Sequence, residues 1–172
     1  MVSIKKADER DIKDLSKKFS MFLKDRNSKI YQDNIAKFGI PDEYAKKALA
    51  EETLLKALFS GKATFYVAVE NDEMVGFAQI IHHDDQVTEL DRIVVFPPHE
   101  RKGIGTQLFH KIVDDERKKG VKTITANVGK NETHAKRFYE RNGFRLKEET
   151  AVNTPWGKKI DLAVYELSLN SY

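Results

Sequence analysis

The 172-residue sequence contains no cysteine. This excludes disulfide bonds, thiolate metal sites and a cysteine nucleophile. No apolar run approaches the ~20 residues that a membrane-spanning helix needs. Residues 1–15 are charged from the fifth residue onward and lack the apolar core of a secretion signal. We therefore expect a cytoplasmic protein that does not associate with a membrane.

A large excess of one charge sign is also missing. The chain has 30 basic and 27 acidic residues, which leaves a net charge of +3. This balance gives no general attraction to nucleic acid, and no stripe of Lys and Arg with interleaved aromatic residues predicts such a surface. With 40% hydrophobic and 33% charged residues, the composition is typical of a soluble globular protein. A chain of this length forms most simply one domain, here residues 1–172.

The spacing of the apolar residues changes along the chain and predicts an α/β protein. Spacings of three and four residues predict helices over residues 8–23, 41–61, 103–119 and 133–142. Alternating or continuous apolar runs predict strands over residues 2–6, 63–70, 74–82, 87–96, 123–128, 144–150 and 160–169. The run from Ile93 to Phe96 predicts burial on both faces of its strand. Helices and strands in this order indicate an α/β sandwich with a mixed sheet.

Two glycines, Gly103 and Gly105, stand where a helix is expected to begin behind the strand 87–96. One interpretation is a tight turn with close helix packing. The other is an anion site, in which amides from Arg101 to Thr106 hold a pyrophosphate and the missing Cβ atoms leave room for it. The spacing fits neither the Walker A loop nor the dinucleotide fingerprint. The glycines alone do not choose between the two interpretations.

A second block, one helix and one strand further on, decides the question. The stretches "LDRIVVFPP" (90–98), "HERKGIGTQLF" (99–109) and "NETHAKRFYERNGF" (131–144) together resemble the GNAT superfamily of N-acetyltransferases. The resemblance covers residues 62–169. It implies a mixed, mostly antiparallel sheet of six to seven strands with about four helices, an acetyl-CoA-binding core over 62–169 and a variable acceptor side over 1–61. One departure is Glu100, where the family prefers Gln or Arg.

The resemblance also implies which residues bind acetyl-CoA. We expect the loop amides to bind the pyrophosphate despite Glu100, whose charge Arg101 and Lys102 would offset. For Lys136 and Arg137, contact with phosphates and simple exposure to solvent remain equal alternatives. The expected cofactor-binding residues are Ile93, Val94, Val95, Arg101, Lys102, Gly103, Ile104, Gly105, Thr106, Asn131, Lys136 and Phe138.

Acetyl transfer to an amine needs a base, a polarised thioester carbonyl and an acid for the departing thiolate. The resemblance places an acid at Tyr139, whose ordinary pKa is near that of an alkyl thiol; a core aromatic residue is the alternative. Glu89 and Asp91 are the candidate bases. Because the two residues are two positions apart, we expect both carboxylates on the same side of the pleat, where each would shift the pKa of the other. The alternative is that one or both form structural ion pairs. A main-chain amide at Val94 or Val95 would polarise the carbonyl.

The acceptor is predicted from the acidic residues of the variable region. Together with Asp84, Asp85, Glu89 and Asp91, they favour a small cationic primary amine such as a polyamine; protein amines and other small amines remain open. A non-catalytic acyl-CoA-binding module is the alternative from another class. Residues 82–85 favour a hairpin turn over a metal site. For Trp156, the side chain would line the acceptor pocket, form a dimer contact or anchor its loop. The resemblance also implies a homodimer. The residues of the variable region that we expect near the acceptor are Asp25, Tyr31, Asp33, Asp42, Glu43, Glu51 and Glu52.

Overall fold

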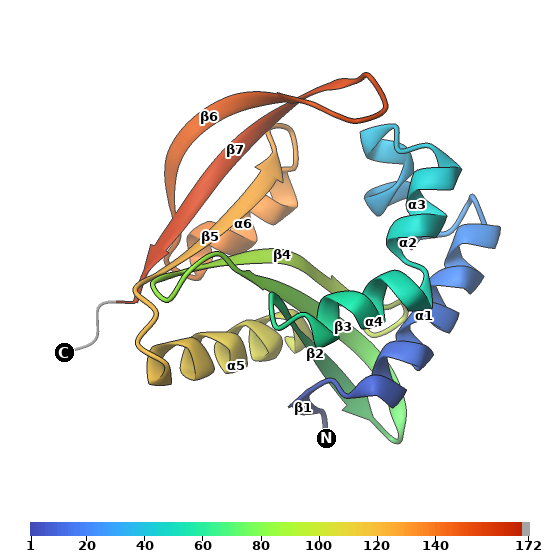
Figure 1. The fold of residues 1–172 in the computed structure, drawn as a ribbon, viewed down its shortest axis with the longest axis horizontal. Helices are drawn as coiled ribbons and strands as arrows, with labels where there is room; N and C mark the ends of the chain where they lie inside the picture. The colour runs from blue at the N-terminus through green and yellow to red at the C-terminus, as the bar shows by residue number, and fades with distance from the viewer. Residues whose placement is uncertain (170–172) are drawn as a thin grey trace.

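The computed structural model describes residues 1–169, which form one seven-stranded sheet flanked by helices (Figure 1). The spatial order of the strands is β1-β2-β3-β4-β5-β7-β6, and only the β4–β5 pair is parallel. This confirms the predicted mixed, mostly antiparallel sheet. The strands are β1 (Ser3–Lys6), β2 (Ala63–Glu70), β3 (Glu73–His82), β4 (Val87–Val95), β5 (Thr123–Gly129), β6 (Arg145–Asn153) and β7 (Lys159–Ser168).

Helices cover both faces of the sheet because the strands bury apolar side chains on both sides. Along β2, Tyr66 belongs to one buried core and its neighbours Phe65 and Val67 belong to the other. Helices α5 and α6 pack on the first core, and the helices of the N-terminal third pack on the second. The helices are α1 (Glu9–Lys24), α2 (Lys29–Asn34), η1 (a 3-10 helix, Ala36–Phe38), α3 (Asp42–Ala48), α4 (Glu51–Phe59), α5 (Ile104–Lys118) and α6 (Thr133–Arg141).

The N-terminal third departs from the sequence prediction between residues 41 and 61. The segment 41–61, expected as one helix, divides into α3 and α4 because Ala50 is extended (φ −66°, ψ 146°). The carbonyl of Leu49, at the end of α3, accepts a hydrogen bond from the Ser16 hydroxyl of α1 at 3.1 Å. Phe59, the last residue of α4, is 68% exposed. Within residues 1–169 there are thus six α-helices and one 3-10 helix rather than about four.

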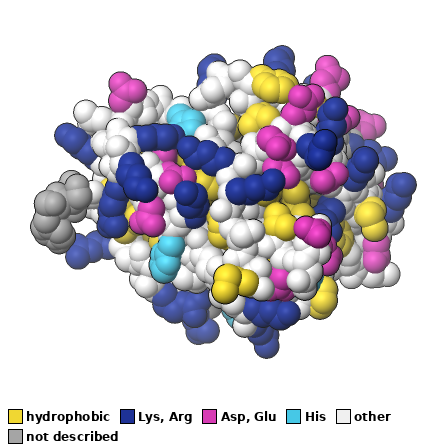
Figure 2. Space-filling view, turned by 90° about the horizontal axis from the view of Figure 1, so that it is seen from below, with side chains coloured by type: hydrophobic (Ala, Val, Ile, Leu, Met, Phe, Trp, Pro, Cys, Tyr) yellow, Lys and Arg dark blue, Asp and Glu magenta, His cyan; other side chains and the backbone are white. Residues whose placement is uncertain are grey.

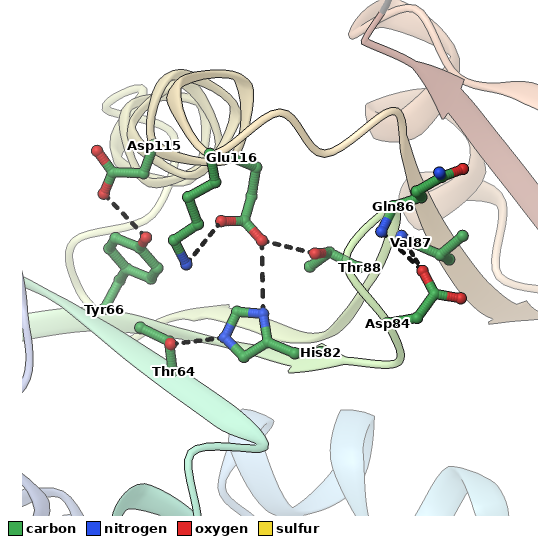
Figure 3. Close-up of polar contacts among 10 residues, drawn as sticks. Thr64, Tyr66, His82, Asp84, Gln86, Val87, Thr88, Asp115 and Glu116 are labelled. Carbon is green, nitrogen blue, oxygen red and sulfur yellow. Dashed lines mark hydrogen bonds and ion pairs between the residues drawn. The ribbon is translucent and has the colours of Figure 1, made fainter.

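A buried polar network fixes α5 to the sheet (Figure 3). The side chain of Glu116 is fully buried, and its Oε1 accepts a hydrogen bond from the Thr88 hydroxyl at 2.6 Å. The same oxygen lies 3.6 Å from Nδ1 of His82, and Lys119 Nζ lies 3.1 Å from Oε2. Burial lowers the pKa of His82, so the ring is neutral near pH 7. The network holds the beginning of β4 against α5.

Strands β4 and β5 separate beyond this point. They pair only where Val87–Glu89 lies beside Thr123–Thr125. From Leu90 to Val95, β4 pairs with β3 alone, so its other edge is open. The run predicted to be buried on both faces does contact both cores, with Ile93 and Val95 against the first and Val94 against the second. These three residues are half-buried beside the open edge, and Phe96 is 2% exposed. The separation creates the space in which the functional site lies.

Candidate functional site

A cleft of about 790 Å³ lies where β4 and β5 separate. Its walls come from β4, from the end of β5 with α6, and from α2 and η1 of the N-terminal region. Seven of the predicted site residues line it: Asp91, Ile93, Val95, Gly105, Asn131, Phe138 and Tyr139. Lining residues that sequence reasoning did not assign to the site are Lys29, Asn34, Lys37, Phe38, Arg92, Asn127, Val128, Glu132, Thr133, His134 and Ala135.

A β-bulge at Asp91 sets the direction of the side chains along β4. In the β3–β4 register, Leu90 pairs with Ile80 and Arg92 pairs with Gln79, which leaves Asp91 as the extra residue. The pleat is thus not regular between Glu89 and Asp91, so their spacing of two does not by itself place them on one side.

The two candidate bases lie in different surroundings. Asp91 lines the cleft, and its side chain is 31% exposed. Partial burial raises the pKa of Asp91, the Arg92 guanidinium opposes this shift, and the Glu89 carboxylate adds to it. Glu89 is not among the residues that line the cleft; its Oε1 lies 2.8 Å from Nε2 of His83. Glu89 thus affects the cleft through its charge on Asp91.

The open edge of β4 presents alternate peptide groups. The Phe96 amide donates to the Val75 carbonyl of β3 at 2.9 Å, and a Cβ built on Gly76 of β3 would lie 3.0 Å from the Val94 carbonyl oxygen. Peptide groups of successive strand residues point to opposite edges. The amides of Ile93 and Val95 therefore face the cleft, and that of Val94 faces β3. Of the two amides predicted to polarise a carbonyl, the geometry favours Val95.

The loop before α5 has the backbone of an anion site. Arg101 (φ +64°) and Gly103 (φ +78°) both adopt the left-handed conformation, which is the pattern of a backbone nest. Gly103 is the N-cap of α5 and supplies no side-chain cap, so the first amides of the helix are free for an anion. The side chains of Arg101 and Lys102 are exposed, and that of Ile104 is buried in the core.

Packing does not require a glycine at position 105, which lines the cleft. A Cβ at Gly105 would lie 3.7 Å from Phe138 and 3.8 Å from Val95, which is ordinary contact. The glycine that a close approach requires is Gly76, where a Cβ would lie 3.0 Å from the Val94 carbonyl oxygen of the neighbouring strand β4. Gly105 lines the cleft, so a Cβ there would occupy space that an anionic ligand could use.

Tyr139 is both a core residue and a residue of the cleft wall. It is 6% exposed and packs against Phe144 with 5.0 Å between ring centroids, as a core residue does. It also lines the cleft. Burial raises the pKa of Tyr139, and the carboxylates of Glu132 and Asp91 add to the shift. The phenol is therefore fully protonated at neutral pH. Burial thus moves the pKa of this phenol away from that of an alkyl thiol.

The predicted acidic acceptor cluster is not gathered in one place. Asp33 and Asp91 line the cleft, but Asp42 accepts a hydrogen bond from Tyr31 at 2.9 Å, and Asp84 accepts from backbone amides of its own turn. Glu132, inside the second sequence block, is a cleft acid that was missed. Burial raises its pKa. The acids Asp33, Asp91 and Glu132 face the cations Lys29, Lys37 and Arg92 in the same cleft, so the lining is mixed in charge.

Outside the cleft, the structure of the described residues places the other candidates. The predicted turn spans residues 83–86, because His82 is still the last residue of β3. No cluster of three or more metal-ligating side chains occurs in residues 1–169. Trp156 packs on Tyr44 of α3 with 5.6 Å between ring centroids, which fits a loop anchor. No helix in the described part of the chain is long and apolar enough to cross a membrane. On the face shown in Figure 2, basic and acidic side chains lie beside one another.

Part of the chain is similar in sequence to known N-acetyltransferases. An uncharacterized N-acetyltransferase of Mycobacterium bovis is 24% identical over 98 residues, which cover 57% of this chain and 63% of that protein. The aminoalkylphosphonate N-acetyltransferase of Salmonella typhimurium is 28% identical over 88 residues, 47% of this chain and 56% of that protein. The chain thus spans less than two thirds of the length of both relatives.

A solved structure has the same fold over nearly the whole chain. The PaiA N-acetyltransferase from Thermoplasma acidophilum, in complex with coenzyme A, has a TM-score of 0.69 at 18% identity and covers 98% of this chain and 99% of that one. The model of the acetyltransferase (GNAT) family matches residues 27–144. This match includes both blocks that carried the resemblance, the open edge of β4 and the cleft. The chain belongs to the acetyltransferase (GNAT) family.

Proposed function

We propose that this protein transfers the acetyl group of acetyl-CoA to the primary amine of a small molecule by direct attack. The observation that carries the proposal is that one cleft combines three features. These are the open edge of β4, the uncapped start of α5, and the side chains of Asp91 and Tyr139. Family membership supplies the reaction class, and the cleft supplies the roles of the residues.

The cofactor fits the residues that are present. The nest at Arg101 and Gly103, with the free amides of α5 up to Thr106, would bind the pyrophosphate. The amides of Ile93 and Val95 would pair with the pantetheine arm as a further strand does. Asn131 and Phe138, on the opposite wall, would contact the same arm. Coenzyme A in the Thermoplasma relative supports this assignment.

Asp91 is the base in the proposed mechanism. An alkylamine with a pKa near 10 is neutral in only about one molecule in a thousand at pH 7, a cost of roughly 4 kcal/mol. A carboxylate with a raised pKa accepts the ammonium proton more readily than an ordinary one does. Asp91 meets this need, and Glu89 helps by raising the pKa of Asp91. The sequence prediction of Glu89 as the base remains an alternative. In that case a chain of water would carry the proton to Glu89, which does not line the cleft.

The transfer step then follows from the positions of Val95 and Tyr139. The amine nitrogen forms a bond to the thioester carbon, and the Val95 amide donates a hydrogen bond to the carbonyl oxygen as it gains negative charge. The C–S bond breaks, and the Tyr139 hydroxyl donates a hydrogen bond to the departing thiolate while keeping its own proton. The second proton, which the nitrogen loses as the amide forms, passes through solvent to the thiolate, so the protons balance. Because its pKa is raised, Tyr139 stabilises the thiolate chiefly as a hydrogen-bond donor.

The acceptor proposed first is a small cationic amine such as a polyamine, held by Asp33, Asp91 and Glu132. A second candidate is an amine that also carries an anionic group, because Lys37 and Arg92 line the same cleft. The Salmonella relative, named for an aminoalkylphosphonate substrate, agrees with the second candidate.

A thiol-release assay across four acceptors tests the proposal. Spermidine, 2-aminoethylphosphonate, an amino acid and a short peptide would each be incubated with acetyl-CoA, with Gly105→Glu as the inactive control. We expect release of coenzyme A with spermidine or the aminophosphonate that Gly105→Glu abolishes. Tight binding of acetyl-CoA with no turnover on any amine would instead support the non-catalytic binding module.

A further inference from the structure

The cofactor loop begins with an acidic residue. Glu100 stands directly before Arg101, and its side chain is 34% exposed. A carboxylate at the entrance of a pyrophosphate site repels the ligand that the loop amides attract. Sequence reasoning expected Arg101 and Lys102 to offset this charge. Within residues 1–169, however, neither forms an ion pair with Glu100.

The compensating cation comes from the acceptor side of the molecule. Lys29, the first residue of α2, places Nζ 3.3 Å from Oε2 of Glu100 and 3.1 Å from Oδ2 of Asp33. The hydrogen bonds to Asp33 and Glu100 raise the pKa of Lys29, so it is charged at neutral pH. The start of α2 is fixed by Ser28, whose hydroxyl accepts from the Tyr31 amide at 3.1 Å.

Lys29 also lines the cleft, so its ion pair with Glu100 links the cleft wall to the beginning of the cofactor loop. Exposed ion pairs contribute little to stability, typically below ~1 kcal/mol. Asp33, four residues along the same helix, already gives Lys29 an intrahelical partner. For Glu100, by contrast, Lys29 is the one cation within ion-pair distance in the described part of the chain.

We propose that Lys29 is a positioning residue for acetyl-CoA: it neutralises Glu100 and thereby keeps the cofactor loop receptive to the pyrophosphate. This inference rests on the proposed binding of acetyl-CoA. It means that a helix of the variable acceptor side completes the electrostatics of the cofactor site. At position 100, where the family prefers Gln or Arg, this chain has Glu100. The positive charge there comes from Lys29, which lies 71 positions earlier in the sequence.

Calorimetric titration with coenzyme A tests the proposal on four proteins: wild type, Lys29→Met, Glu100→Gln and the double variant. We expect Lys29→Met to weaken binding about five- to tenfold, as one uncompensated charge near a phosphate does in a partly exposed site. Glu100→Gln should bind at least as tightly as wild type. The double variant should return to within about twofold of wild type, because Lys29 is not needed once Glu100 is neutral.

Two controls separate this role from a structural one. Lys29→Arg should bind within about twofold of wild type. Lys13→Met removes an exposed lysine that pairs with Glu9 on α1, far from the loop in sequence, and should not change binding. Wild-type affinity in Lys29→Met, or a double variant as weak as Lys29→Met, would overturn the proposal. Failure of wild type to bind coenzyme A would instead contradict the proposed function.

Discussion

Replacing Gly105 by alanine should raise stability and weaken cofactor binding at the same time. The new Cβ would meet Phe138 at 3.7 Å and Val95 at 3.8 Å, so the protein accommodates it without movement. Gly105 is the second residue of α5, and exchanging glycine for alanine within a helix stabilises by roughly 0.5–1 kcal/mol. For a protein of this size, the melting temperature should rise by about 1–4 °C.

The binding loss follows from where the methyl group points. It enters the cleft beside the loop amides and displaces the cofactor from at least one of them. One charge-assisted hydrogen bond contributes roughly 1.5–3 kcal/mol, so the Kd for coenzyme A should rise about tenfold to a hundredfold. Thermal denaturation and calorimetric titration of the same preparation measure both quantities.

Gly76→Ala is the matched comparison. Its Cβ would lie 3.0 Å from the Val94 carbonyl oxygen of β4, so this variant should lose stability. Unchanged coenzyme A affinity in Gly105→Ala, with the expected gain in melting temperature, would refute the idea that Gly105 clears space for the cofactor.

Three further predictions concern single residues. Tyr139→Phe should lower kcat about a hundredfold or more while the KM for acetyl-CoA changes less than about twofold; an unchanged kcat in steady-state kinetics would remove Tyr139 from the mechanism. Asp91 acts deprotonated, so wild-type activity should rise with pH through the raised pKa of this carboxyl, and Asp91→Asn should lose that limb of the pH profile; a profile that keeps the limb would assign the base to another group. Glu116→Ala leaves the buried Thr88 hydroxyl without its acceptor and should lower the free energy of unfolding in urea denaturation by about 1–3 kcal/mol; a loss below about 0.5 kcal/mol would show that the network does not hold α5.

Much of the fold could be predicted because its signals are local. Strand alternation identified the seven strands, and the spacing of apolar residues identified α1, α5 and α6. The division of residues 41–61 at Ala50 has no local sequence signal. The hydrogen bond found beside it joins Ser16 of α1 to the Leu49 carbonyl, 33 residues away.

The candidate site likewise contains residues that local sequence patterns predict and residues that only long-range contacts bring together. Gly105, Asn131 and Tyr139 belong to contiguous blocks, so the sequence located them. The bulge that isolates Asp91 depends on the register between two strands, which a single sequence does not specify. The partnership of Lys29 and Glu100 spans 71 positions, and no local pattern brings them together.

The most direct test of the central claim is mass spectrometry of candidate amines after incubation with the protein and acetyl-CoA. The proposed mechanism predicts an N-acetylated product from at least one small primary amine, and its absence with Gly105→Glu. Tight binding of acetyl-CoA without an acetylated product from any amine would contradict the claim that the cleft performs acetyl transfer.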